Sequence, residues 1–228
     1  MKEPSSKKPY LDKTAKIFIK EVELKGGKPL YELTPEQARE FLTNLQYQYH
    51  KDLDAHVEDI EIFTEIAGTV SLRIIKPQEY KDQKLPLIIY CHGGGWVMGD
   101  AQSFDMTVRT IAKHTKSAVA FVNYSRSPEF QYPTALNQIY GAMKYLYENP
   151  DEFNIDSENI AITGDSAGGN MAAAAAIKAN KEGTVKLKCE ALVYPVTDAD
   201  MKTESYDQFK DGPWLTKKAM EWFWDCLL

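Results

Sequence analysis

Short runs of continuous apolar residues alternate with amphipathic stretches through the middle of the chain. Four of the runs have the length of buried strands, at residues 85–91, 118–123, 159–163 and 189–194. Such runs are typical of parallel strands that are covered on both faces. Stretches with helical spacing lie between them, around residues 103–114, 134–148 and 168–181. The pattern predicts an α/β sandwich, with a mostly parallel central sheet joined by crossover helices on both faces.

The pattern before the first of these runs is different. Residues 57–63 and 69–75 alternate between apolar and polar side chains on either side of Gly68, as the strands of an antiparallel pair do. Residues 1–55 have helical periodicity, and the segment 34–37 (Thr-Pro-Glu-Gln) is a good helix start.

The helix that starts there has an apolar stripe at Ala38, Phe41, Leu42, Leu45 and Tyr49. Packing against the core is the favoured interpretation of this stripe, and a lining of the substrate entrance by Phe41, Leu45 and Tyr49 is the alternative.

The chain becomes polar and then aromatic after Pro195. Trp214, Trp222, Phe223 and Trp224 fall close together in this last part. They indicate either a helix pinned to the core or a wall of an apolar pocket, and the pattern leaves both open. We therefore divide the chain into an N-terminal helical cap segment (1–55), an α/β core (56–195) and a partial cap insertion (196–228).

The segment 164–168, Gly-Asp-Ser-Ala-Gly, lies between an apolar strand-like run and an alanine-rich helix. A serine hydroxyl needs a tight strand-to-helix turn, where a base can reach it and backbone N–H groups can stabilise an oxyanion. Glycines two residues to either side of Ser166 allow that turn, since they carry no side chain to collide with the neighbouring strand or helix. In this setting a nucleophile at Ser166 is favoured over a structural turn.

A second glycine motif, His92-Gly93-Gly94-Gly95-Trp96, follows the apolar run 85–91. Consecutive glycines leave backbone N–H groups unobstructed, as an oxyanion hole requires. The alternatives are a flexible turn and a phosphate-binding loop, but no Lys-Ser/Thr follows at P-loop spacing. The position of His92 beside the glycines favours a role in shaping this loop over a role as general base.

With these two motifs, and with the segments 123–129, 194–195 and 211–216, the chain resembles the α/β-hydrolase superfamily, and within it the hormone-sensitive-lipase-like esterases. The resemblance implies that Ser166 is the nucleophile and that the N–H groups of Gly94, Gly95 and Ala167 form the oxyanion hole. It implies no metal and no organic cofactor.

The same family orders its triad as serine, then an acid, then histidine along the chain. All four histidines, His50, His56, His92 and His114, precede Ser166. The acids that follow it come before the place where the family has its triad acid; they include Asp198, Asp200, Asp207, Asp211 and Asp225. We therefore expect a C-terminally truncated esterase that lacks its final strands and is inactive alone.

Composition narrows the function further. The chain has 228 residues, 43% of them hydrophobic, and a net charge of −6 from 27 basic and 33 acidic residues. That charge gives no electrostatic reason to bind nucleic acid or an anionic membrane. No signal peptide or membrane-spanning run is evident, so we expect a cytoplasmic protein.

Three cysteines, Cys91, Cys189 and Cys226, are widely separated, and Cys91 and Cys189 are expected to be small buried hydrophobes. His50, His56 and His114 have polar neighbours and are expected at the surface.

The leading hypothesis is a serine carboxylester hydrolase that acts on small-molecule esters through an acyl-enzyme. The alternative is a non-catalytic small-molecule-binding protein on the same fold, as in the plant gibberellin receptors that resemble these esterases. A peptidase or thioesterase would share the chemistry and differ only in the shape of the pocket. The sequence does not determine the acyl and alcohol specificity or the oligomeric state.

Overall fold

A six-stranded sheet forms the centre of the protein, whose computed structural model describes residues 10–47 and 53–228. The strand order is β1-β2-β4-β3-β5-β6. The first two strands run antiparallel, β2 is antiparallel to β4, and the β4-β3-β5-β6 part is parallel. The strands are β1 (Ala55–Thr64), β2 (Gly68–Pro77), β3 (Leu85–Cys91), β4 (Ala118–Val122), β5 (Ile155–Asp165) and β6 (Leu187–Val193).

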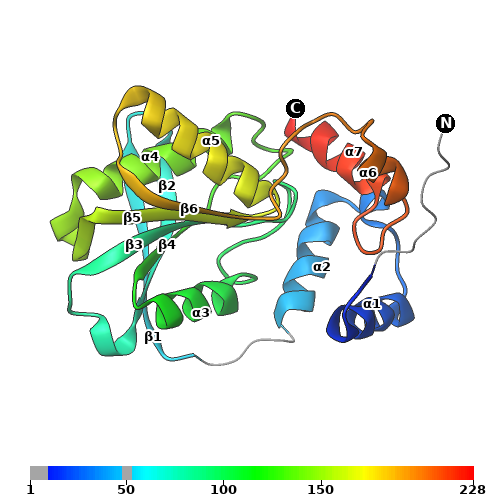
Figure 1. Cartoon of the computed structure of the whole chain (residues 1–228), viewed down its shortest axis with the longest axis horizontal. Coiled ribbons are helices and arrows are strands. Elements are labelled where there is room, and N and C mark those ends of the chain that lie inside the picture. Colours follow the sequence, from blue (N-terminus) through cyan, green and yellow to red (C-terminus); the bar gives the residue numbers. More distant parts are fainter. Residues whose placement is uncertain (1–9, 48–52) are drawn as a thin grey trace.

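Helices cover the sheet on both faces, as the sequence predicts. Figure 1 shows α4 (Thr134–Glu148) and α5 (Ala167–Glu182) on one face and α3 (Asp105–Thr115) on the other. Each of these helices connects two parallel strands, which confirms the α/β sandwich. Short 3₁₀ turns occur at Leu30–Glu32, Gln78–Tyr80 and Pro150–Phe153.

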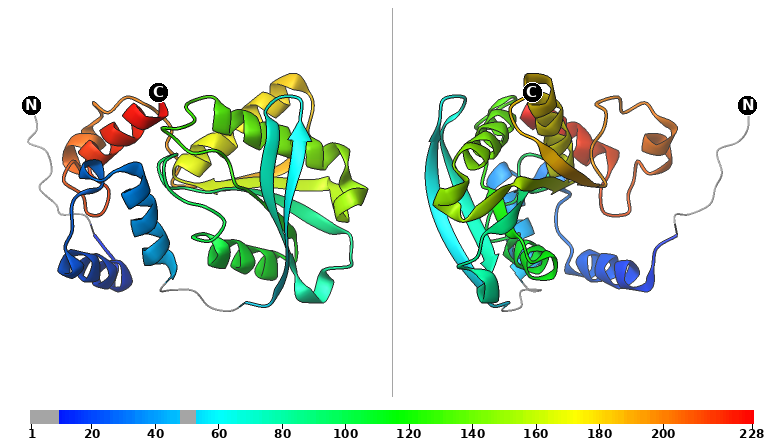
Figure 2. Two further views of the ribbon diagram at one scale, coloured as in Figure 1. Left: turned by 180° about the vertical axis from the view of Figure 1, so that it is seen from behind. Right: turned by 60° about the vertical axis from the view of Figure 1, so that its left-hand side comes forward.

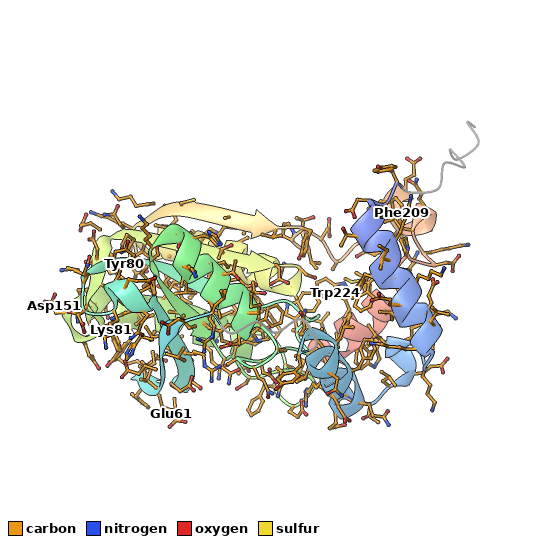
Figure 3. All side chains as sticks on the ribbon, turned by 90° about the horizontal axis from the view of Figure 1, so that it is seen from below. Glu61, Tyr80, Lys81, Asp151, Phe209 and Trp224 are labelled. Atoms are coloured by element: carbon orange, nitrogen blue, oxygen red, sulfur yellow. The ribbon has the colours of Figure 1, made fainter. Side chains whose placement is uncertain are left out.

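Four further helices gather at the end of the sheet where the parallel strands finish (Figures 1 and 2). We call them the helical cover: α1 (Lys13–Lys25), α2 (Pro35–Tyr47), α6 (Glu204–Gln208) and α7 (Lys217–Leu227). In Figure 3, Phe209 marks the outer end of this cover and Trp224 lies on its inner side, while Asp151 marks the opposite end of the molecule. Within residues 10–47 and 53–228, no helix has the length and apolar character needed to cross a membrane.

The two central strands are the most deeply buried part of the sheet. All of β4 is buried, and in β3 Leu87, Ile89 and Cys91 have no exposed surface. Their apolar runs are continuous because helices press on both faces of these strands.

The prediction of burial is wrong for β6. Only Leu187 is half-buried, and the rest of the strand is exposed, including Cys189. Among the described residues β6 pairs with β5 alone, so one of its edges is free of strand partners. The apolar run therefore predicted the strand correctly but did not predict its burial. By contrast, His56 and His114 lie at the surface as expected, and His50 falls outside the described residues.

The helix α2 begins as predicted, with a reciprocal cap. The Gln37 N–H donates to Thr34 Oγ1 (3.3 Å), and the Thr34 N–H donates to Gln37 Oε1 (3.1 Å). Of the apolar stripe, Ala38 and Leu42 are buried in the hydrophobic core and Leu45 is also buried, while Tyr49 lies outside the described residues.

One arginine ties α2 to the core. The Arg39 guanidinium donates through Nε to Val97 O (2.8 Å) and through Nη2 to Ser127 O (2.9 Å). It also makes a two-pronged ion pair with the Glu129 carboxylate at 2.8 and 2.6 Å. These hydrogen bonds from Arg39 lower the pKa of Glu129 to about 2.

We predict that Glu129→Gln weakens the fold in a pH-dependent way. The unfolded carboxyl titrates near 4.3, and the folded one near 2, so its contribution is complete above about pH 4.5 and disappears as the pH falls toward 2. The difference in unfolding free energy between wild type and variant should therefore be larger at pH 6 than at pH 3. Urea unfolding at the two pH values measures it.

Glu158→Gln is the matched control, because Glu158 is exposed and has no cation partner among the described residues. A Glu129→Gln loss of equal size at both pH values would show that the charge of this carboxylate does not matter.

Candidate active site

Ser166 occupies the single position between β5 and α5. Its backbone has φ 54° and ψ −119°, in a region that non-glycine residues rarely adopt. Three backbone hydrogen bonds hold it there: Ser166 N–H donates to Val193 O (2.9 Å), and Ser166 O accepts from Asn170 N–H (3.0 Å) and Val196 N–H (3.2 Å). Strain of this kind persists where the surroundings enforce it, and it is concentrated at functional sites.

Two glycines allow the chain to turn this tightly. A Cβ on Gly168 would lie 2.0 Å from the carbonyl oxygen of Cys91, and a Cβ on Gly164 would lie 2.5 Å from the Gly168 backbone. No side chain fits at those distances. Helix α5 therefore starts in direct backbone contact with the end of β3.

The glycine loop 93–95 begins where β3 ends. Gly94 (φ 110°) and Gly95 (φ 63°) both have left-handed backbones, and Gly94 O accepts hydrogen bonds from Met98 N–H (2.8 Å) and Val97 N–H (3.2 Å). Within residues 10–47 and 53–228, the N–H groups of Gly94 and Gly95 donate to no other protein group. Ala167 is fully buried as the first residue of α5, where helix N–H groups have no partner inside the helix.

A cavity of about 540 Å³ brings Ser166, Gly94 and Gly95 together. Its size is that of a small-molecule site. Three of the predicted site residues thus line one cavity. The fourth, Ala167, follows Ser166 in the chain and does not line the cavity itself. Aromatic side chains from the helical cover, the core and the segment between α6 and α7 supply much of the wall, namely Phe41, Phe104, Trp214 and Phe223.

Asp165 is a site residue that sequence reasoning missed. Its Oδ1 accepts hydrogen bonds from the Tyr90 hydroxyl (2.8 Å) and from the Gly93 N–H (3.0 Å). Burial raises the pKa of Asp165, and these hydrogen bonds act in the opposite direction. The carboxylate next to Ser166 therefore anchors the start of the glycine loop. The only sequence signal for this role is the position of Asp165 inside the serine motif 164–168.

His92 is enclosed in the core and does not line the cavity. Its ring is fully buried, stacks on Tyr124 (4.0 Å between centroids) and Phe121 (5.1 Å), and has Nδ1 2.8 Å from Gly93 O. Burial lowers the pKa of His92 to about 4, so the ring is neutral at pH 7. This environment fits a residue that shapes the glycine loop.

Ser166 also borders a second hollow of about 500 Å³, which is lined by Asp198, Asp200 and Tyr206 among others. No histidine of the described part of the chain lines either hollow beside Ser166. The described residues therefore show a serine and an amide cluster without a histidine base in contact.

Residues 88–228 match the family model of the alpha/beta hydrolase fold. The chain belongs to the alpha/beta hydrolase family. Its resemblance to the hormone-sensitive-lipase-like carboxylesterases is confirmed by esterases among both its relatives and its structural neighbours.

R526 of Acanthamoeba polyphaga mimivirus, named as an alpha/beta hydrolase, is 39% identical over 94% of this chain and 60% of its own length. The carboxylesterase NlhH of Mycobacterium tuberculosis is 34% identical over 68% of this chain and 48% of its own length. The crystal structure of a thermostable esterase from Pseudomonas putida matches with a TM-score of 0.93 and 38% identity, over 98% of this chain and 70% of that one. The chain thus spans about half to three fifths of these curated relatives.

We predict that Gly168→Ala destabilises the protein although alanine is the better helix former. The new methyl group would meet the Cys91 carbonyl at 2.0 Å. Forced overpacking of this kind costs about 1–3 kcal/mol, more than the gain of up to about 1 kcal/mol from helix propensity. Urea unfolding measures the loss.

The same substitution one residue later is the control. A Cβ on Gly169 comes no closer than 3.0 Å to its neighbours, so Gly169→Ala should cost less. Equal losses, or a stabilised Gly168→Ala, would contradict the contact between α5 and β3.

A second prediction concerns His92. In the folded protein its ring should titrate with a midpoint of about 4, because burial penalises the charged form, while the unfolded chain titrates near 6.5. The folded state therefore loses stability relative to the unfolded state as the pH falls from 6.5 toward 4. Following the imidazole resonances of His92 by NMR, with the urea-unfolded chain as reference, measures the midpoint. A folded midpoint at or above 6.5 would refute the buried neutral ring.

Proposed function

We propose that this protein is a carboxylester hydrolase that works through an acyl-enzyme on Ser166. The Ser166 hydroxyl attacks the ester carbonyl and loses its proton to a base. The N–H groups of Gly94, Gly95 and Ala167 stabilise the oxyanion of the tetrahedral intermediate, and the alcohol leaves with a proton. Water then cleaves the acyl-serine ester by the same route and regenerates the hydroxyl.

The observation that carries this proposal is the junction at Ser166. A strained serine at the start of α5 borders the same cavity as Gly94 and Gly95, whose N–H groups have no acceptor among the described residues. The helix start adds a positive dipole end at this point. The wall of aromatic and aliphatic side chains supports an uncharged ester of small size as the substrate. The helical cover would then act as the cap over this cavity.

The mechanism also needs a general base. His92 is enclosed in the core and His56 and His114 are exposed on β1 and α3, so none of these described histidines lies in the cavity. We infer that the 228 residues alone turn esters over slowly. Serine-hydrolase sites without a working triad retain about 10³–10⁴-fold catalysis over water, from binding and the oxyanion hole.

We predict that Ser166→Ala lowers the kcat of the natural gene product, whatever its length, on p-nitrophenyl butyrate by about 10⁴–10⁶-fold. The lost hydroxyl is the attacking group in the proposal. Ser157→Ala, a change of the same kind near the start of β5, is the control and should leave the rate unchanged, because Ser157 lines neither hollow beside Ser166. The same assay on the 228-residue chain should show only residual turnover.

Unchanged turnover in Ser166→Ala would overturn the proposal. Brisk turnover by the 228 residues that depends on Ser166 would show instead that these residues hold a working base.

A second candidate is a small-molecule-binding protein without catalysis. The absence of a described histidine at Ser166 favours it, because a receptor needs the cavity but no base. Binding of butyrate esters to the natural gene product, with no release of p-nitrophenol, would decide for this candidate.

A further inference from the structure

A further apolar cavity, which we call the far cavity, adjoins the one at Ser166. Its volume is about 370 Å³, and its wall includes Ile19 and Val22 of α1. Three residues, Leu30, Phe41 and Trp214, line both cavities. The two spaces are therefore neighbours that share one wall.

The shared wall is built on an aromatic contact. The Trp214 ring stacks on Phe41 with centroids 6.3 Å apart and 27° between the planes, and it meets Phe18 of α1 at 5.2 Å. Figure 1 shows the chain between α6 and α7 reaching toward α1. Trp214 thus joins the C-terminal part of the cover to the N-terminal part.

Trp214 is held in place at some energetic cost. Its φ of 70° lies in the left-handed region, where a bulky side chain is an outlier. The residue remains 46% exposed despite its two aromatic contacts. A strained tryptophan that is open to the two spaces on either side suits a partition better than a packing residue.

The far cavity suits an alkyl chain. Helix α1 has no buried residue, although Phe18, Ile19 and Val22 form an apolar side that is only half-buried. This side faces the cavity at Ile19 and Val22, and Leu30 continues the aliphatic wall. The charged lining residues are Glu23 and Lys28, one of each sign.

We propose that Trp214, backed by Phe41, is the residue that limits the length of the alkyl chain accepted at Ser166. In the wild type the chain ends against the Trp214 ring, and the space beyond the ring is the extension that longer chains need. This proposal rests on the proposed function. It adds that the hydrolase selects esters with short alkyl chains.

Binding and turnover test it separately. Binding uses three uncleavable ester analogues, methyl propyl, methyl hexyl and methyl nonyl ketone, followed by calorimetry on the natural gene product. Turnover uses p-nitrophenyl butyrate and decanoate. If the protein does not turn over the esters but its ketone affinities still depend on chain length as expected, the proposed hydrolase function is wrong and the length limit at Trp214 is retained.

Trp214→Ala should extend the accepted length. Each additional methylene that becomes buried strengthens binding about fourfold. We expect methyl nonyl ketone to bind the variant about 10–100-fold more tightly than wild type, with methyl propyl ketone changed less than about twofold. The ratio of kcat/KM for decanoate over butyrate should rise in the same direction.

Three variants make the result specific. Trp214→Phe keeps a ring at the wall and should keep most of the limit. Trp222→Ala removes a tryptophan of α7 that lines neither cavity, and should leave the profile unchanged. Val22→Phe, added to Trp214→Ala, refills the far cavity and should remove the gain.

Two results would overturn the proposal. One is a Trp214→Ala profile that shifts equally for all chain lengths or does not shift, in protein whose thermal unfolding shows an intact fold. The other is a gain for long chains that Val22→Phe leaves in place, because the chain would then run elsewhere.

Discussion

The close contact between the start of α5 and the end of β3 is the constraint on which the rest of the site depends. Gly168 leaves no room for a Cβ against the Cys91 carbonyl, and Gly164 leaves none against Gly168. With the helix this close to the sheet, Ser166 has to turn in a left-handed conformation between β5 and α5. The same contact lies at the end of β3, and the glycine loop starts two residues after Cys91. A single backbone contact therefore places both halves of the candidate site.

Hydrogen bonds then hold the loop from two directions. Asp165, next to the serine, accepts the Gly93 N–H at the start of the loop, so the serine turn and the loop are linked directly. Arg39 donates to Val97 O at the other end and connects the loop to α2. The Phe223 ring of α7 packs so closely on Gly95 that a Cβ there would lie 2.2 Å from it. The core and the helical cover thus both determine the direction of the Gly94 and Gly95 N–H groups.

Much of this was predictable from local sequence. Apolar runs predicted β3 with its observed bounds and β4 to within one residue, because both strands are covered on two faces. β5 is longer than predicted: its first residues, 155–158, include polar side chains and join the sheet through an irregular pairing with β3. Burial of β6 was not predictable, since it depends on what lies beside the strand and not on the strand's own residues.

In the site, too, local sequence predicts some features, and others depend on residues that are distant in the chain. The glycine spacing around Ser166 and the run at 93–95 predicted a turn and a loop, and the structure brings them to one cavity. The Tyr90–Asp165 and Arg39–Val97 hydrogen bonds join residues 75 and 58 positions apart, and no local pattern signals such pairs. In the sequence, Trp214 is only one of several clustered aromatic residues. Its place between two cavities depends on how α1 and α2 pack, which periodicity alone does not give.

We propose that this backbone junction makes Ser166 the reactive hydroxyl of the protein. The most direct test treats the natural gene product with a fluorophosphonate ester and locates the adduct by peptide mapping, with Ser166→Ala in parallel. We expect one adduct, on Ser166, and none in the variant. An adduct on another serine, such as Ser103 or Ser125, or undiminished labelling of the variant, would contradict it.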